Sequence, residues 1–497
     1  MQKSTVISSL DIREVGAVKE VKQGIVKVSG LPSCIFGQLV DFGHGQKGMV
    51  MGFNQYEVLV IVLGDDSSIN TGDTVTSRSE LLTVPVGPGF VGRVVDCLAR
   101  PIDARGDIKA ADNYPVFREA LGVMEREPVT APLETGTKIL DMVIPIGKGQ
   151  RELVIGDRQT GKTSIALDAI LNQKGKNVIC IYCYIGGSQS ALKKTMSLLN
   201  EKAASPYTIV LCATASSTPA EQYLAPYVAA CLGEYFMFNG QDVLLIFDDL
   251  TKHAWAYRQL SLLLERPPGR EAYPGDIFYI HSQLMERAGK LKAGLGGGTM
   301  TFLPIASTLQ GDITGYIQSN LVSMTDGQIY LSSALFYEGF KPAIDLGLSV
   351  SRIGSKVQSP AIRNVSGGLR LQYAQYRELQ RLTRLRTKLS KEAMDQIRRG
   401  ETLRELLIQE NGKPVSMAEE IVIFYAFKKR ILEILKPDVL KNFKREFFKY
   451  LCNVEPMLVD KIEKEQTLTD DITTSLDRNI VNYFQDTNHL TKAHGSS

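Results

Sequence analysis

The sequence lacks long apolar runs, a strong net charge and paired cysteine motifs. No apolar stretch approaches the ~20 residues of a membrane-spanning helix, and the N-terminus has no apolar core followed by a cleavage site, as a secretory signal would. The formal net charge of +3 over 497 residues is too small to indicate binding to nucleic acid or to an anionic membrane surface. We therefore expect any membrane association to depend on partner proteins.

The seven cysteines lie scattered in apolar segments, which favours a reducing compartment. Cys180 and Cys183 form one CxxC, but it falls within the strand-like run NVICIYCYI. A strand places residues three apart on opposite faces, and no second Cys or His pair completes a zinc site. We interpret both as small buried apolar residues.

The protein is too long for one hydrophobic core. Short glycine-punctuated β segments such as GIVKVSG and KGMVMGF follow one another near the N-terminus and predict a small barrel or sandwich. Apolar strand-like runs then alternate with helical stretches, which predicts a largely parallel sheet covered by helices. The remainder is charged with helical periodicity and predicts a helical bundle. We place these three domains at residues 1–82, 83–358 and 359–497.

The strongest motif is the segment from Gly156 to Thr163, GDRQTGKT, which fits the phosphate-loop pattern G-x-x-x-x-G-K-[ST]. The strand-like RELVI precedes it and the helical TSIALDAI follows it. Its backbone N–H groups and the helix N-terminus would face phosphate oxygens. Lys162 would reach the β and γ phosphates of ATP, or the β phosphate of ADP, and Thr163 would hold Mg²⁺. The nucleotide-binding residues predicted here are Gly156, Asp157, Arg158, Gln159, Thr160, Gly161, Lys162, Thr163 and Ser164.

A second segment supplies an acid for the same site. The apolar run VLLIF ends in Asp248, which suits a carboxylate that supports Mg²⁺ together with Thr163. Asp249 follows, and we interpret it as the cap of the next helix.

A group able to activate water is missing from the sequence around this site. No Asp or Glu occurs between Asp168 and Glu201, the region that includes the end of the next strand. The site therefore fits Mg-ATP binding without hydrolysis, because the general base is absent.

A third segment, GLSVSRIG, places Arg352 just beyond a predicted strand. An arginine flanked by small residues can reach across a subunit interface to a neighbour's γ phosphate, as an arginine finger does. Taken without other information, a surface arginine is the more common interpretation.

With these motifs in order, the sequence resembles the alpha subunits of F-type ATP synthases. The resemblance runs from about residue 18 to residue 420 and includes GIVKVSGLP, RVVDCLARPID, IPIGKGQRELVIGDRQTGKT, FDDLTKHAWAYRQLSLLLERPPGREAYPGD, MTDGQIY and PAIDLGLSVSRIGS. The loop GDRQTGKT and the segment SVSRIGS have the alpha form. The resemblance implies an N-terminal β-barrel, a central RecA-like P-loop domain and a C-terminal helical bundle.

The resemblance also implies partners and roles. The protein would alternate with beta subunits in a three-plus-three ring around a gamma shaft, with a delta-type stalk subunit at the N-terminal arm. Arg352 would complete the catalytic site on beta, with Ser349 and Ser323 nearby. The head would lie peripherally on the cytoplasmic face of a bacterial plasma membrane, or on the equivalent organellar membrane. It would contact the membrane only through the proton-translocating sector and would bind no nucleic acid.

The sequence departs from the family pattern at several positions. Gly187 stands where alpha subunits usually have glutamine, Lys341 replaces an arginine, and Asn411 lies where glutamines border the adenine. These changes affect the predicted recognition of the base, and the affinity for nucleotide, at the protein's own site. The arm before Val18 is short, which bears on the delta-type contact, and residues 386–390 are basic where the family often has acids.

Two other functions stay open at this point. A homohexameric RecA-like motor ATPase of the secretion or Rho type would need a working base, and only Asp249 lies close to Asp248. A scaffold that has lost nucleotide binding is the second alternative, and the intact phosphate loop argues against it.

Overall fold

The computed structural model describes residues 13–43, 45–54, 56–384 and 390–486. Internal contacts divide the protein into two compact units, which we describe separately. The first comprises Met1–Glu125, Ile179–Arg287 and Ala293–Gly298, and the second comprises Arg126–Val178, Ala288–Lys292 and Thr299–Ser497. Most of the N-terminal arm and of the basic segment 386–390 lies outside the described residues.

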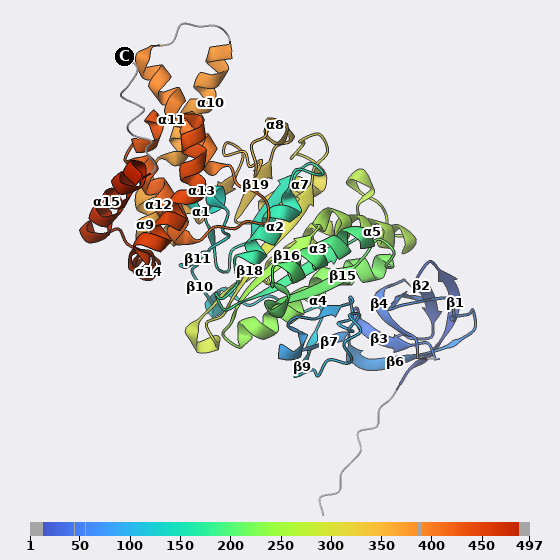
Figure 1. The fold of residues 1–497 in the computed structure, drawn as a ribbon. Helices are drawn as coiled ribbons and strands as arrows, with labels where there is room; N and C mark the ends of the chain where they lie inside the picture. Colours follow the sequence, from blue (N-terminus) through green and yellow to red (C-terminus); the bar gives the residue numbers. More distant parts are fainter. Residues whose placement is uncertain (1–12, 44, 55, 385–389, 487–497) are drawn as a thin grey trace, which may run out of the picture. The chain divides into compact units, whose positions relative to one another are not determined.

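The first unit begins with a closed antiparallel barrel whose strands follow the order β1-β2-β5-β4-β3-β6 (Figure 1). The strands are β1 (Val15–Lys22), β2 (Ile25–Ser29), β3 (Gln38–Asp41), β4 (Lys47–Phe53), β5 (Val58–Val62) and β6 (Thr74–Leu81). Valines from all around the barrel fill its core. Gly48 in β4 lets the strands close tightly, because a Cβ there would lie 2.5 Å from both Phe42 and Val60 side chains. Closure removes the exposed sheet edges. Of the barrel and the sandwich predicted from the sequence, the structure has the barrel.

The rest of the first unit is an α/β layer in which β16, β14, β15 and β8 lie side by side in that order. β14 pairs in parallel with β15, which pairs in parallel with β8, and β7 pairs with β9 outside this sheet. The strands are β7 (Thr83–Val86), β8 (Val94–Val95), β9 (Asp112–Pro115), β14 (Val178–Ile185), β15 (Thr208–Ala213) and β16 (Asp242–Asp248). The helices are α3 (Gln189–Glu201), α4 (Pro219–Phe238), α5 (Leu250–Leu263) and α6 (Ile277–Met285). Because helices cover β14 to β16, these strands are buried along nearly their whole length and are mostly apolar between their ends.

In the second unit, β13 lies between β18 and β19 and pairs in parallel with both, and β11 pairs with β12 apart from them. β20 pairs antiparallel with β19, and β17 joins β18 to β10. Its strands are β10 (Arg126–Glu127), β11 (Pro132–Leu133), β12 (Ile146–Gly147), β13 (Glu152–Gly156), β17 (Gly289–Leu291), β18 (Thr299–Ser307), β19 (Gly327–Leu331) and β20 (Val350–Ser351). The helices packed with these strands or close to them are α1 (Lys138–Val143), α2 (Lys162–Leu171), α7 (Tyr316–Met324) and α8 (Ser333–Tyr337).

The second unit ends in a helical bundle (Figure 1). Its helices are α9 (Pro360–Ser366), α10 (Leu369–Arg384), α11 (Lys391–Leu407), α12 (Met417–Lys428), α13 (Pro437–Val454), α14 (Pro456–Glu465) and α15 (Asp470–Asp486). α12 is buried nearly all round. Phe443 and Phe447 of α13 stack with ring centroids 4.6 Å apart and pack against Tyr483 and Phe484 of α15.

The predicted fold class is confirmed. The pattern over residues 419–436 favours continuous helix, but α12 ends at Lys428 and Arg430 has a left-handed φ of 62°. Pro437 begins the next helix, and a proline disfavours helical backbone at the residue before it. The predicted domain boundaries after residues 82 and 358 stay predictions.

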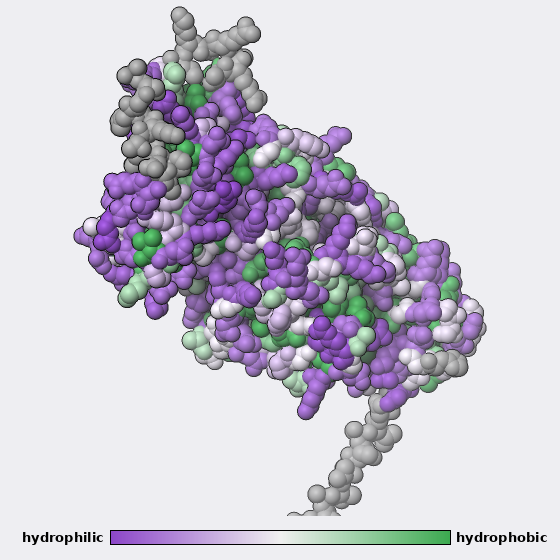
Figure 2. Space-filling model, viewed as in Figure 1, coloured by the Kyte–Doolittle hydropathy of each residue, from purple (hydrophilic) through white to green (hydrophobic). Residues whose placement is uncertain are grey.

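The described surface is mainly hydrophilic on the face shown in Figure 2, with hydrophobic residues in scattered patches among polar ones. No helix within the described ranges combines the length and apolar character needed to span a lipid bilayer. Cys180 and Cys183 are fully buried in β14, and burial raises the pKa of both thiols. Both cysteines therefore behave as apolar core residues, as predicted.

Two histidines are buried together in the first unit. His253 Nδ1 lies 3.4 Å from His281 Nε2, and His253 Nε2 lies 3.1 Å from the Tyr223 carbonyl oxygen. Burial lowers the pKa of His253 to about 4. Burial, together with the neighbouring His253, lowers that of His281 to about 3. The folded state therefore holds both rings neutral.

This pair predicts a loss of stability in acid. Below pH 6.5 the unfolded state takes up protons that the folded state excludes, so the free energy of unfolding falls as the pH drops from about 6.5 to about 4. The expected loss is on the order of 3 kcal/mol per histidine. Urea unfolding at a series of pH values would show a shallower decline for His281→Phe than for the parent protein. Equal slopes for the two proteins would contradict this assignment.

Candidate functional site

The phosphate loop connects β13 to α2 in the second unit. Gly161 is the N-cap of α2 with a left-handed φ of 100°, which favours glycine. A Cβ at Gly156 would lie 2.5 Å from the Leu331 carbonyl oxygen. The glycines of the motif therefore allow a tight turn that ends at a helix N-terminus, where the first N–H groups lack intrahelical partners.

Lys162 lies inside this turn and is 7% exposed. Its Nζ donates to the carbonyl oxygens of Gly156 at 2.8 Å and Asp157 at 2.5 Å. The ammonium group is thus held within the loop by oxygen acceptors, and phosphate oxygens are acceptors of the same kind. This geometry fits a bound phosphate.

Asp157, predicted to bind nucleotide, uses its side chain to hold the loop instead. Its carboxylate accepts hydrogen bonds from Thr308 Oγ1 at 2.6 Å, Gly311 N at 2.8 Å and Ser333 Oγ at 2.7 Å. Partial burial raises its pKa, but these donors outweigh burial and hold it below the usual value. The carboxylate therefore fastens the loop to the segments after β18 and β19.

The other predicted loop residues differ in exposure. Arg158 and Gln159 are exposed, Thr160 is buried, and Thr163 and Ser164 are partly buried in the first turn of α2. Thr160 Oγ1 donates to the Asp157 carbonyl oxygen at 2.8 Å. Gln159 has a left-handed φ of 64°. The Thr163 side chain thus lies in the helical turn where the motif places its Mg²⁺ ligand.

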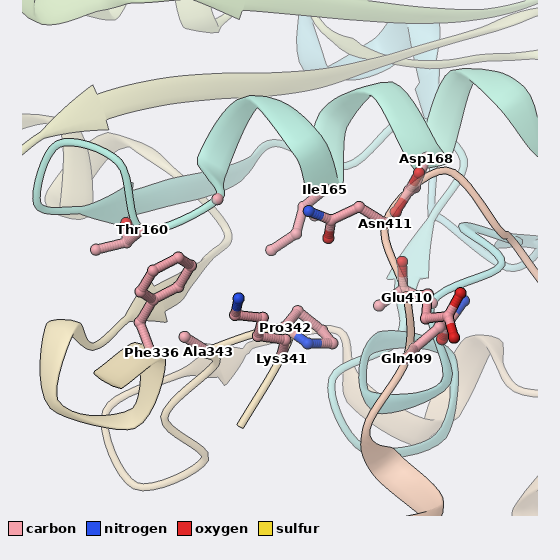
Figure 3. Close-up of a pocket in the computed structure, with 12 residues that line it drawn as sticks. Thr160, Ile165, Asp168, Phe336, Lys341, Pro342, Ala343, Gln409, Glu410 and Asn411 are labelled. Atoms are coloured by element: carbon pink, nitrogen blue, oxygen red, sulfur yellow. The ribbon is translucent and has the colours of Figure 1, made fainter. Parts of the chain in front are cut away.

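A cavity adjoins the loop within the second unit (Figure 3). Its lining combines loop residues with residues from α2, α8 and the 341–343 and 409–411 segments: Thr137, Thr160, Gly161, Ile165, Asp168, Phe336, Lys341, Pro342, Ala343, Gln409, Glu410 and Asn411. An aromatic ring, aliphatic groups and a few polar groups suit a planar heterocyclic base.

Two of the departures from the family pattern, Lys341 and Asn411, line this cavity. Lys341 Nζ lies 4.6 Å from the centroid of the Phe336 ring. The Asn411 amide points into the cavity in Figure 3 and makes no hydrogen bond with other described residues. Asn411 is therefore the polar group best placed to meet a ligand there.

Sequence reasoning missed Gln409, Phe336 and Asp168. Gln409 donates to the Gly136 carbonyl at 2.7 Å and accepts from Lys138 N at 3.1 Å. Asp168 accepts from Gly412 N at 2.8 Å. Both hold the 409–412 segment beside the cavity. The available signal was a charged residue, Asp168, among the apolar residues of the second half of α2.

Asp248 lies in the first unit, at the end of β16. It is 7% exposed and accepts a hydrogen bond from Tyr182 Oη at 2.8 Å. Asp249 is the N-cap of α5 and accepts from Lys252 N at 2.8 Å, which confirms the capping role predicted for it.

Gly187 lies against Tyr184 at the end of β14. A Cβ at Gly187 would lie 2.0 Å from Tyr184 Oη and 2.2 Å from its Cζ. Tyr184 Oη donates to the Ser188 carbonyl oxygen at 3.0 Å, which fixes the ring there. The phenol therefore fills the space next to Gly187 that a larger side chain would enter.

Arg352 follows β20 in the second unit. Its guanidinium is exposed, and no hydrogen bond or ion pair joins it to another residue of the described ranges. Its backbone is fixed, because Arg352 N donates to the Asp326 carbonyl at 2.9 Å. The preceding Ser351 Oγ accepts from Gln150 Nε2 at 3.2 Å and donates to the Pro145 carbonyl at 2.9 Å.

The two serines predicted beside Arg352 differ. Ser349 is fully buried, and its Oγ accepts from Tyr330 N at 2.9 Å. It therefore holds β19 and the segment before Arg352 together. Ser323 is exposed on α7, three residues before Asp326, and donates to the Asn320 carbonyl at 2.7 Å.

A buried carboxyl lies beneath this segment. Glu152 is fully buried, accepts from Gln150 Nε2 at 2.6 Å and has one oxygen without a partner among the described residues. Burial, then the charge of Asp326, raises the pKa of Glu152 well above its usual value. A Cβ at Gly327 would lie 2.4 Å from Glu152 Oε2 and 2.3 Å from the Val350 carbonyl. The motifs RELVIG, MTDGQIY and SVSRIGS therefore meet at one point.

Comparison with protein families agrees with this architecture. The nucleotide-binding domain of the ATP synthase alpha/beta family matches residues 136–351, the family's β-barrel domain matches residues 11–78, and the family's C-terminal domain matches residues 358–483. The protein belongs to the ATP synthase alpha/beta family. The predicted family resemblance is thus confirmed, and the phosphate loop lies within the family's nucleotide-binding domain.

Several curated relatives from this family are named ATP synthase subunit alpha. The Petrotoga mobilis protein is 47% identical over 474 residues, which cover 95% of this protein and 94% of the relative. The Clostridium acetobutylicum protein is 47% identical over 476 residues, with 96% and 94% covered. The Clostridium botulinum (strain Langeland) protein is 46% identical over 473 residues, with 95% and 94% covered. These matches do not favour the motor-ATPase alternative.

The packing of Gly187 on Tyr184 predicts that the two positions are coupled. Gly187→Gln alone should destabilise the fold by roughly 1–3 kcal/mol, because the new side chain meets the buried phenol. In a Tyr184→Ala background the same substitution should cost much less. Urea unfolding of the parent, both single variants and the double variant would give the coupling energy. If the changes in unfolding free energy of the two single variants simply add in the double variant, the Tyr184 ring changes its conformation without an energetic cost, and the prediction is wrong.

Proposed function

We propose that this protein is the alpha subunit of a rotary F-type ATP synthase, which binds nucleotide without hydrolysing it and supplies Arg352 to the catalytic site of a neighbouring beta subunit. The assembled enzyme would make ATP from ADP and phosphate using a transmembrane proton gradient. The observation that carries the proposal is an exposed arginine whose side chain makes no hydrogen bond or ion pair within the described ranges, while its backbone N–H is bonded to the Asp326 carbonyl.

The protein's own site supports nucleotide binding. The phosphate loop provides Lys162 and the helix N-terminus for the phosphates, and the adjoining cavity provides an apolar space for the base. Thr163 would hold Mg²⁺ through its hydroxyl, an oxygen ligand that this ion accepts. Bound Mg²⁺ would neutralise phosphate charge.

The absence of turnover is supported by the lack of acidic residues in the sequence that follows α2. No Asp or Glu lies between Asp168 and Glu201, and Gly187 provides no side chain. Asp249, the remaining candidate base, is 5% exposed and caps α5. A carboxylate that accepts a helix N–H is poorly placed to take a proton from water.

Arg352 supports a role at the neighbouring subunit. A guanidinium can pair with two phosphate oxygens and stabilise the charge that develops on them. Because Arg352 N donates to the Asp326 carbonyl and the Ser351 hydroxyl donates to the Pro145 carbonyl, the Arg352 side chain would start from a fixed position, which lowers the cost of orienting it. Ser349 would act by holding this segment, and Ser323 would lie at the same interface.

The remaining elements of the proposal concern assembly. Beta subunits would alternate with this protein around the gamma shaft, and a delta-type stalk subunit would bind its N-terminal arm. The complex would be peripheral on the cytoplasmic face of a bacterial plasma membrane or on the equivalent organellar membrane. Contact with the membrane would run through the proton-translocating sector.

The first test measures Mg-ATP binding and ATP hydrolysis on the same purified protein. Binding without sustained hydrolysis is expected, because the site lacks a base. Lys162→Ala should weaken binding strongly, since it removes the ammonium group inside the loop. Sustained hydrolysis that Lys162→Ala abolishes would instead favour the motor-ATPase alternative.

The second test measures steady ATP turnover by the ring reconstituted with a beta subunit. Arg352→Ala should lower turnover by roughly 10³-fold or more, the usual contribution of an arginine finger, while nucleotide binding to the isolated protein stays unchanged. Arg352→Lys should restore little, because lysine lacks the planar two-donor geometry. Lys356→Ala, which removes an exposed cation close by in sequence, is the matched control. Normal turnover by Arg352→Ala would falsify the assignment.

A further inference from the structure

A cleft lined by arginines lies beside the segment that leads to Arg352. It has a volume of about 480 Å³ and runs between α10 and residues 345–347. Arg370, Arg377 and Arg381 line it from α10, where spacings of seven and four residues place side chains on one helix face. We call it the arginine cleft. Three arginines of α10 thus contribute to one defined cavity.

The arginines of the cleft keep much of their hydrogen-bonding capacity. Arg370 Nη2 donates to the Ser349 carbonyl at 2.8 Å, and Arg377 Nη1 donates to Glu338 Oε2 at 3.1 Å and Gln380 Oε1 at 3.3 Å. Arg381 has no hydrogen bond or ion pair with another residue in the described part of the protein. Since each guanidinium carries five N–H donors, most of these donors remain available to a ligand.

Two acidic residues also line the cleft. Asp345 Oδ1 is already an acceptor for Gly347 N at 2.8 Å and Leu348 N at 3.3 Å. Glu378 precedes Arg381 by less than one helical turn. Three positive and two negative side chains line the cleft, and Arg377 is already ion-paired with Glu338 at 3.1 Å. Arg381, which has no ion pair in the described part of the protein, is therefore the cation that favours an anion there.

Tyr373 adds a neutral donor from the same helix. The residue lines the cleft and is only 4% exposed, and its hydroxyl has no hydrogen-bond partner among the described residues. The ring is fixed by stacking on Phe340 at 5.9 Å. Burial raises its pKa to about 12, so the hydroxyl stays protonated at neutral pH. A buried hydroxyl without a partner is costly, and a ligand oxygen would satisfy it.

We propose that the arginine cleft is a binding site for inorganic phosphate. Phosphate offers several oxygen acceptors, which match guanidinium forks and a phenol donor at the same time. Arg370 joins this cleft to Ser349, three residues before Arg352. Phosphate held there would therefore bear on the position of Arg352, a consequence that rests on the function proposed above.

The test is equilibrium binding of ³²P-labelled phosphate to the full-length protein. The Lys162→Ala background removes the contribution of the phosphate loop, and constant ionic strength is kept with chloride. We expect saturable binding in this background. Arg381→Gln should weaken it at least tenfold, and Tyr373→Phe, which removes only the hydroxyl, should weaken it severalfold. Arg398→Gln, on the exposed face of α11, changes charge equally and should have no effect.

Two results would overturn the proposal. One is the absence of saturable phosphate binding in the Lys162→Ala background. The other is an equal loss with Arg381→Gln and Arg398→Gln, which would indicate only nonspecific charge attraction. Both substituted arginines are exposed, so neither variant disturbs the core. The measurement needs no beta subunit, so it can fail while the Arg352 assignment holds, and the reverse is equally possible.

Discussion

The pairing of β13 with strands on both of its edges is the constraint on which the second unit depends. The C-terminal end of β13 leads directly into the phosphate loop. At its N-terminal end, Gln150 and Glu152 lie under the segment that carries Arg352. One buried strand thus sets the position of the protein's own nucleotide-binding loop and of an arginine proposed to act on a neighbour. A shift of this strand would move both together, because its residues are fully buried and close-packed.

The hydrogen bonds around this strand join segments that are distant in sequence. Asp157 accepts from residues 308, 311 and 333, and Arg352 donates to Asp326. The loop and the Arg352 segment are therefore fixed by the protein itself. A loop that is already in its binding conformation loses little conformational freedom when a ligand enters. This agrees with a subunit whose proposed task is to hold nucleotide and to present one side chain.

The sequence predicted the elements with strong local signals. The phosphate loop follows from residue spacing and from its flanking strand and helix, and the barrel follows from closely spaced β segments. The helix cap at Asp249 was predicted from its place after a strand. Tertiary contacts had no such signal. Three such contacts depend on residues many positions apart in the sequence. They are the approach of Glu152 to Gly327, the burial of Ser349, and the hydrogen bond from Gly412 N to Asp168. Gln409 was missed because a polar residue in a loop is usually solvent-exposed.

The contact between Tyr184 and Gly187 has a consequence for how this protein can change over generations. With the phenol in place, any side chain added at position 187 meets the ring at less than van der Waals distance. With the ring removed, the core loses a buried aromatic group. Each single step away from the present pair is therefore penalised, although both steps together need not be. The effect of a substitution at one of these two positions therefore depends on the residue at the other. A glutamine at position 187 is tolerated without this penalty only after, or together with, a smaller residue at position 184.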